Sequence, residues 1–204
     1  MTFGKKLLRD HDIVGSVAVF AAAATVCENG EQTAHSVQVI TQCVEAMREA
    51  NVAMVQDASC LKEIVKDFVI PLMRQKMLYI KSSSSVSEYH KCLNLASVFL
   101  DIAHCEGLSN QLNEQEQTLI EAKQTMDDVF GNLAVKQKIY GNVLNNLGCA
   151  YYHKSLFREA ASFFEQAIEA NKAATDFGDE KRRKQCIMSS EKSLRGALQN
   201  IPSY

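Results

Sequence analysis

The sequence predicts an all-α protein, and three observations carry this prediction. Only two prolines and nine glycines interrupt its 204 residues, and most of the chain consists of residues that favour helices, such as Ala, Leu, Glu, Gln and Lys. Apolar residues recur at steps of three and four, which is the spacing of one helix face. One segment also has the spacing of a repeated helical hairpin. We therefore expect antiparallel helical hairpins in a short α-solenoid, preceded by an N-terminal helical bundle.

Composition narrows the classes of function. Apolar residues make up 47% of the chain and charged residues 23%, and the formal net charge is −2, so no overall field attracts nucleic acid. The seven cysteines are odd in number and scattered, as in a reduced intracellular protein. The apolar run 13–26 is similar to a secretory signal, but Asp10 and Asp12 before it favour a buried first helix. We expect a cytoplasmic protein without nucleic-acid or membrane partners.

A heptad seam runs through the first half of the chain. Its members are Val37, Ile40, Val44, Met47, Asn51, Met54, Ala58, Leu61, Val65, Phe68 and Leu72. It predicts one helix over about 33–70 that Pro71 ends or kinks, with a hairpin broken near 57–59 as the alternative. The flanking positions are also apolar, which favours burial in a bundle over a two-stranded coiled coil. The seam also allows a homodimer through the N-terminal helices.

Four consecutive serines at 82–85 predict a boundary between two domains. Residues 1–81 are expected to form the N-terminal helical bundle, and residues 86–204 a domain of helical hairpins. The expected helices of this second domain lie at 86–105, 113–128, 133–154, 157–174 and 179–199.

The segment 141–174 carries the most specific pattern. Its pattern residues are Leu144, Leu147, Gly148, Tyr151, Ala160, Phe164 and Ala167. Their spacing resembles the tetratricopeptide repeat, W-x2-L-G-x2-Y followed by A-x3-F, and in particular the repeats of kinesin light chains and of Gα-regulating scaffold proteins. Leu144 replaces the usual Trp, and Lys172 stands where Pro is usual. Small residues at 148 and 160 are expected where the two helices touch, with a short turn at Ser155 and Leu156.

Flanking helices are expected to complete the stack, because one hairpin cannot bury its own apolar face. Upstream, Leu95, Ala96 and Phe99 are assigned to the Leu, Gly and Tyr places of an earlier, degenerate repeat, with Ala122 in its second helix. Downstream, the helix at 179–199 is expected to cap the array.

The resemblance implies that the first helix of each hairpin lines a concave groove. The residues that it places toward a partner are Asn142, Asn145, Asn146, Cys149 and Tyr152. Asparagines in mid-helix are poor helix formers, but their amides can bond to a peptide backbone. The basic run 181–184 opposes the helix dipole, and Lys184 is the groove-facing candidate, which would fit an acidic partner. Ordinary solvation of these polar side chains is the alternative.

We expect a non-catalytic adaptor that binds a protein or peptide, with no metal and no cofactor. His90 and His104 lie about 21 Å apart on one helix and cannot share an ion. Phosphate-loop, nucleophile-elbow and metalloprotease motifs are absent from the sequence. Two alternatives remain: a structural or oligomerising module that acts through the 37–72 seam, and a helical pocket for a small hydrophobic ligand.

Overall fold

The computed structural model describes residues 62–63, 65–84 and 86–202. These residues form helices and turns, with no strand among them, which confirms the predicted all-α class. The chain divides into two compact units, Met1–Tyr79 with Leu108–Asn110, and Ile80–Gly107 with Gln111–Tyr204. The apolar run 13–26 and the seam up to Leu61 lie outside the described residues. The helix predicted over 33–70, and its alternative hairpin, therefore stay predictions.

The first described segment shows how the chain accommodates Pro71. A π-helical turn at Val65–Val69 leads directly into α5 (Ile70–Ser82), and Pro71 lies in the first turn of that helix. Proline has no N–H group to donate to the carbonyl four residues earlier. A widened turn is a common way to absorb such a break in the hydrogen-bond ladder. The disturbance predicted at Pro71 is therefore a wide turn, after which the chain continues as a helix.

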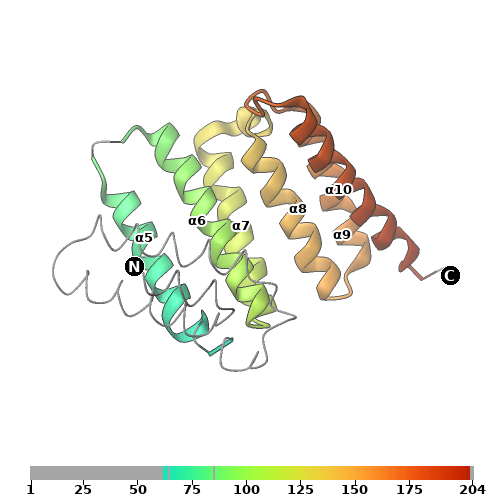
Figure 1. Cartoon of the computed structure of the whole chain (residues 1–204), viewed down its shortest axis with the longest axis horizontal. Helices are drawn as coiled ribbons and strands as arrows, with labels where there is room; N and C mark the ends of the chain where they lie inside the picture. The colour runs from blue at the N-terminus through green and yellow to red at the C-terminus, as the bar shows by residue number, and fades with distance from the viewer. Residues whose placement is uncertain (1–61, 64, 85, 203–204) are drawn as a thin grey trace, which may run out of the picture. The chain divides into compact units, whose positions relative to one another are not determined.

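The second unit is a series of helices joined by short turns. They are α6 (Glu88–Leu108), α7 (Leu112–Phe130), α8 (Lys138–His153), α9 (Phe157–Ala173) and α10 (Glu180–Gln199). From α7 onward each helix packs against the next one in the chain, so that α9 contacts both α8 and α10 (Figure 1). This is the packing order of stacked helical hairpins. None of the described helices has both the length and the apolar character that crossing a bilayer requires.

One predicted helix is shorter than expected. The helix predicted over 133–154 begins only at Lys138, because Gly131–Lys136 forms a 3₁₀ turn and Gln137 is extended, with φ −98° and ψ 122°. The backbone N–H of Lys138 donates to Asp176 Oδ1 at 2.6 Å. The N–H of Thr175 donates to the carbonyl of Lys136 at 2.9 Å. The loop between α9 and α10 thus caps α8 from a distant part of the sequence.

The turns that close the hairpins α6–α7 and α8–α9 have the same geometry. Asn110 and Ser155 both have a φ of 61°. The next N–H group bonds five residues back in each case, from Gln111 to Glu106 at 2.8 Å and from Leu156 to Tyr151 at 2.9 Å. This is the Schellman arrangement for a helix end. The two hairpins therefore correspond residue by residue, 45 positions apart.

This correspondence corrects the register predicted for the earlier repeat. Phe99 takes the place of Leu144, not of Tyr151, and Ala96 takes the place of Gly141, not of Gly148. The matching buried pairs are Ile102 with Leu147, Ala103 with Gly148, Leu119 with Phe164 and Ala122 with Ala167. Ala122 does lie in the second helix, as predicted. The prediction failed because Glu106 stands at the place of Tyr151, so the motif letters are missing although the burial pattern is present.

The hairpin α8–α9 has the close contact that the motif predicts. Gly148 lies so near Phe164 that a Cβ atom built on it would stand 2.6 Å from two carbons of the phenyl ring. Leu147, Ala160 and Ala167 are fully buried around this contact. The small residues therefore let two helix backbones approach closely enough for the aromatic ring to fill the space between them.

A polar cluster joins the two hairpins at the turn after α8. Lys154 forms an ion pair with Glu116 of α7 and donates to Asn113 Oδ1 at 2.9 Å. The hydrogen bond between Tyr151 and Glu116 raises the pKa of Tyr151 to about 12. The hydrogen bond from Lys154 is the main reason that the pKa of Glu116 lies below its ordinary value of 4.5. Glu116 is therefore bound in its ionised form.

This cluster predicts that acid destabilises the protein partly through Glu116. A carboxyl whose folded-state pKa is lowered stabilises the fold above its unfolded-state pKa, and this contribution is lost as the pH falls through the folded-state value. The free energy of unfolding, measured by urea titration between about pH 6 and pH 3, should therefore fall less steeply in Glu116→Gln than in the wild type. Glu165→Gln, at an exposed site on α9, is the control and should keep the wild-type slope. Equal slopes in wild type and Glu116→Gln would contradict the prediction.

Candidate protein-binding groove

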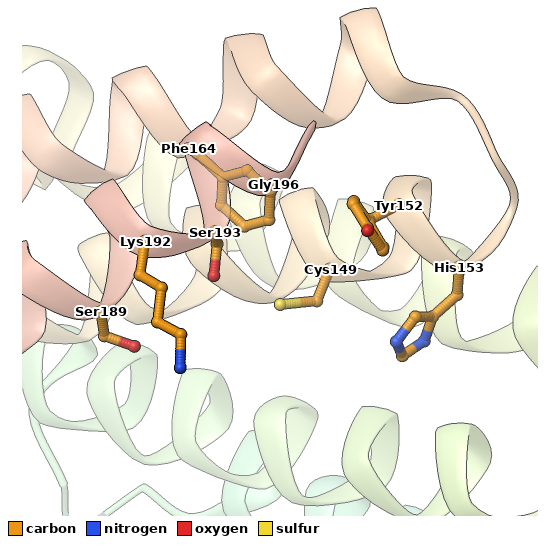
Figure 2. A pocket seen from close by; sticks show the side chains of 8 residues that line it. All are labelled: Cys149, Tyr152, His153, Phe164, Ser189, Lys192, Ser193 and Gly196. Carbon is orange, nitrogen blue, oxygen red and sulfur yellow. The ribbon is translucent and has the colours of Figure 1, made fainter. Parts of the chain in front are cut away.

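A pocket of about 400 Å³ opens between α8 and α10. Its lining residues are Cys149, Tyr152 and His153 of α8, Phe164 of α9, and Ser189, Lys192, Ser193 and Gly196 of α10. Figure 2 shows side chains from the three helices around this space. The ring of Phe164 is buried and forms an apolar floor, while the hydroxyl, amino and imidazole groups supply polar atoms. A few polar groups around an apolar base are typical of sites that bind ligands or side chains.

Small residues create this pocket. Both α8 and α10 pack on α9, and three of the four α10 residues that line the space are small, namely Ser189, Ser193 and Gly196, the fourth being Lys192. The side chain of Ser193 is too short to fill the gap toward α8, and Gly196 has no side chain. The groove is therefore a consequence of α10 packing on α9 with small side chains turned toward α8.

Two of the predicted contact residues, Cys149 and Tyr152, line the pocket. Burial raises the pKa of the Cys149 thiol, so this group is a neutral lining residue at physiological pH and not a thiolate. The Tyr152 ring packs edge to face on Phe157 with centroids 5.3 Å apart. Its hydroxyl accepts a hydrogen bond from Asn200 Nδ2 at 3.2 Å. Tyr152 is thus held in place before any partner arrives.

The three predicted asparagines lie outside the pocket lining and partly serve the fold. Asn145 Oδ1 accepts a hydrogen bond from Ser190 Oγ of α10 at 2.8 Å, which joins the two helices beside the groove. Asn146 Nδ2 donates to the backbone carbonyl of Asn142 at 2.8 Å. Asn142 itself is exposed. Their predicted contact with a partner is not tested by these bonds and stays a prediction.

The basic run at the start of α10 divides into a structural and a solvent-exposed part. Arg183 Nη2 donates to the carbonyl of Ala174 at 2.9 Å, and its guanidinium lies over the ring of Phe177, 5.6 Å from the centroid. Arg183 therefore fastens the loop that caps α8. Lys184 is exposed and lies outside the pocket lining. Asp179 caps α10 by accepting from the N–H of Lys181 at 2.8 Å.

Sequence reasoning missed His153 and the four residues that α10 contributes to the pocket. The available signal was weak, because Lys192 is an isolated charge and the serines carry no motif. The side chains of His90 and Cys92 make contacts other than with a metal. His90 Nδ1 lies 2.8 Å from Ser87 Oγ in the same turn, and the Cys92 thiol donates to the carbonyl of Thr125 on α7 at 3.5 Å. Within residues 62–63, 65–84 and 86–202, no group of three potential metal ligands is brought together.

Comparison with known proteins gives little beyond this geometry. The sequence matches no protein-family model and no curated protein. Among solved structures, the chain is similar to the crystal structure of BtubC (BKLC) from P. vanneervenii, with a TM-score of 0.48 and 14% identical residues. The similarity covers 98% of this chain and 83% of that one. At this level it assigns no function to the chain.

Proposed function

We propose that the protein is a non-catalytic binding module that holds a segment of a partner protein along α8 and α10. The pocket between these helices is the observation that carries the proposal. Its apolar floor and polar rim suit one inserted side chain, and Asn142, Asn146 and Lys184 extend the polar surface along the first helices. In the hairpin architecture this side of the array suits an extended or helical segment.

The chemistry of the pocket supports binding without catalysis. A nucleophilic cysteine needs a lowered pKa, whereas burial raises that of Cys149. The partner's side chain would displace water from the space over Phe164, and Lys192 and His153 would bond to its polar neighbours. We propose a cytoplasmic site of action because Cys92, Cys149 and Cys186 are thiols outside any disulfide.

Affinity purification with pocket variants tests this function. Ser189 is exposed at the rim of the pocket, so that Ser189→Trp places a large ring across the opening without burying it in the core. Proteins that the tagged wild-type chain recovers from a cell lysate are expected to be depleted about tenfold or more with this variant, since a lost buried contact costs about 1–3 kcal/mol. Asn145→Ala/Asn146→Ala and Lys184→Glu should each weaken the same binder.

Ser162→Trp is the matched control, because Ser162 is an exposed serine on α9 outside the pocket. It should recover the wild-type set of proteins. If every binder survives Ser189→Trp with the fold intact by circular dichroism, the groove is not the binding surface. In that case the N-terminal unit would be the interacting part of the chain, with the 37–72 seam as an oligomerising module.

A small hydrophobic ligand is the second candidate occupant. The volume of about 400 Å³ lies within the range of sites for small molecules. Native mass spectrometry of the purified chain would show such a ligand as a mass increment that disappears in Ser189→Trp.

A further inference from the structure

Charge is divided between two sets of helices in the second unit. Together, α8 and α10 carry seven basic side chains and two acidic ones. In contrast, α7 and α9 together carry eight acidic side chains and three basic ones. The formal net charge of the whole chain is only −2. The division therefore depends on where the charges lie, and it gives α10 and α7 surfaces of opposite sign.

The basic surface is concentrated in one stripe on α10. This basic stripe consists of Lys181, Lys184, Met188, Lys192 and Arg195, all of them exposed. Steps of three and four residues place them on one face of the helix, over a length of about 21 Å. Met188, at the centre, is 64% exposed. Glu191 lies at the edge of the stripe that faces α9, where its charge acts on Lys172.

The acidic surface has a matching stripe on α7. This acidic stripe consists of Glu114, Gln117, Glu121, Gln124 and Asp128, which are also all exposed. It has the same spacing and the same length of about 21 Å. Ile120, 40% exposed, lies beside its centre. The two glutamines donate to Glu121 at 3.3 Å and to Asp128 at 2.6 Å, which positions the carboxylates without neutralising them.

No ion pair between residues that the structure describes neutralises either stripe. Among the described residues, the ion pairs involve other side chains: Lys91 with Glu88, Lys123 with Asp127, Lys154 with Glu116, Lys172 with Glu169, and Arg183 with Glu180. The four cations of the basic stripe and the three carboxylates of the acidic stripe thus form no ion pair within the described part of the chain. Each stripe also has an exposed apolar residue at or beside its midpoint.

We infer that the basic stripe of one molecule docks on the acidic stripe of a second copy of this chain. Two stripes of equal length and opposite charge can lie along each other as a helix pair, with Met188 against Ile120 at the middle. The two surfaces differ, so the contact is heterologous and leaves one free stripe at each end of a dimer, from which a chain of molecules can grow. Exposed ion pairs contribute little individually, so the association is weak and sensitive to salt.

Sedimentation velocity of the full chain at low and high salt measures this association. At about 20 mM salt the sedimentation coefficient is expected to rise with protein concentration through dimers to larger species. The apparent Kd should increase about tenfold or more at about 300 mM salt, because the Debye length falls below the distance over which the stripes attract each other. A dimer that forms through apolar N-terminal helices would persist at high salt and can be told apart in this way.

Two charge-reversal variants test which surfaces meet. Lys181→Glu/Arg195→Glu brings the net charge of the basic stripe to zero, and Glu114→Lys/Asp128→Lys reverses the sign of the acidic stripe. Each variant alone should no longer show the salt-dependent association seen by sedimentation velocity. Their equimolar mixture should recover salt-dependent association, because the intact basic stripe of one variant can bind the intact acidic stripe of the other. Arg158→Glu/Lys172→Glu, at exposed positions of α9 outside both stripes, is the charge-matched control and should associate like the wild type.

Wild-type protein that shows no salt-dependent association at low salt would overturn self-docking and leave the basic stripe for an acidic partner of another kind. Association that survives in both variants, or a mixture that gives no dimer, would overturn it as well. Lys192 lines the pocket and Lys184 is assigned to the groove as well as to the stripe, so the charge reversals are placed at Lys181, Arg195, Glu114 and Asp128, which do not line the pocket. The experiments can therefore contradict self-association through the stripes without contradicting partner binding in the pocket, and the reverse.

Discussion

Replacing Phe164 with alanine is expected to lower the free energy of unfolding by about 3–5 kcal/mol. The ring is 1% exposed and belongs to a cluster with Ala160, Ala161 and Ala197. It contacts Gly148 across the hairpin and also forms the floor of the pocket. The buried members of this cluster are alanines, whose side chains are too short to fill the space that the ring would leave, while Tyr152 and Leu194 pack against the cluster and are only partly buried. The cavity should therefore remain largely open, which is the condition for a cost at the upper end of this range.

Phe163→Ala is the matched control for this prediction. Phe163 precedes Phe164 on α9 but is only half-buried, and its ring stacks on Tyr151 with centroids 5.2 Å apart. Its loss should cost about 1–2 kcal/mol, from partial burial and one aromatic pair. Urea denaturation followed by circular dichroism compares the two variants. Losses of equal size would show that Phe164 is not the centre of the hairpin core.

Most helix boundaries of the second unit could be predicted from the sequence, because local signals fix them. Asp179 caps α10 at the predicted position, and the turn at Ser155 and Leu156 ends α8 as expected. The start of α8 at Lys138 could not be predicted in this way. It is fixed by Asp176, which lies far away in the sequence and reaches α8 only after α9 has folded back.

The first hairpin shows a different limit of motif reading. Its turn and its burial pattern repeat those of α8–α9, yet Ala103, Glu106 and Gln115 replace the Gly, Tyr and Ala of the motif. The prediction therefore assigned the Leu and Gly places of the motif to Leu95 and Ala96, which is the wrong register. The backbone geometry at Asn110, which sequence does not reveal, is what fixes the register.

Only part of the candidate site could be predicted, because only α8 carries a recognisable motif. Cys149 and Tyr152 were identified because they occupy defined places in a recognisable first helix. Ser189 and Lys192 were not, because α10 has no motif letters and its position beside α8 depends on packing across α9. The amide of Asn145 was expected to face a partner, but its oxygen bonds to Ser190, a contact between helices that periodicity alone does not show.

Gly148→Leu is expected to cost about 1–3 kcal/mol of folding free energy, and Gly148→Ala a smaller amount of the same sign. Alanine alone would normally stabilise a helix by up to about 1 kcal/mol relative to glycine. Here its Cβ would stand 2.6 Å from the Phe164 ring, so the ring or the helix must move. Because Phe164 is 1% exposed and packs against Ala160, Ala161 and Ala197, we expect the overlap to outweigh the gain in helix propensity.

Gly196→Ala provides the opposite case in the same protein. Gly196 also lies within a helix, α10, but a Cβ atom built on it would meet nothing within 4 Å. This substitution should stabilise the protein by about 0.5–1 kcal/mol, because alanine has the better helix propensity and no overlap offsets it. Thermal and urea denaturation of the two alanine variants should therefore give shifts of opposite sign relative to the wild type. If Gly148→Ala stabilised the protein as much as Gly196→Ala does, α8 and α9 would not approach each other closely at Gly148. The contact between Gly148 and Phe164, which forms the floor of the pocket, would then be contradicted as well.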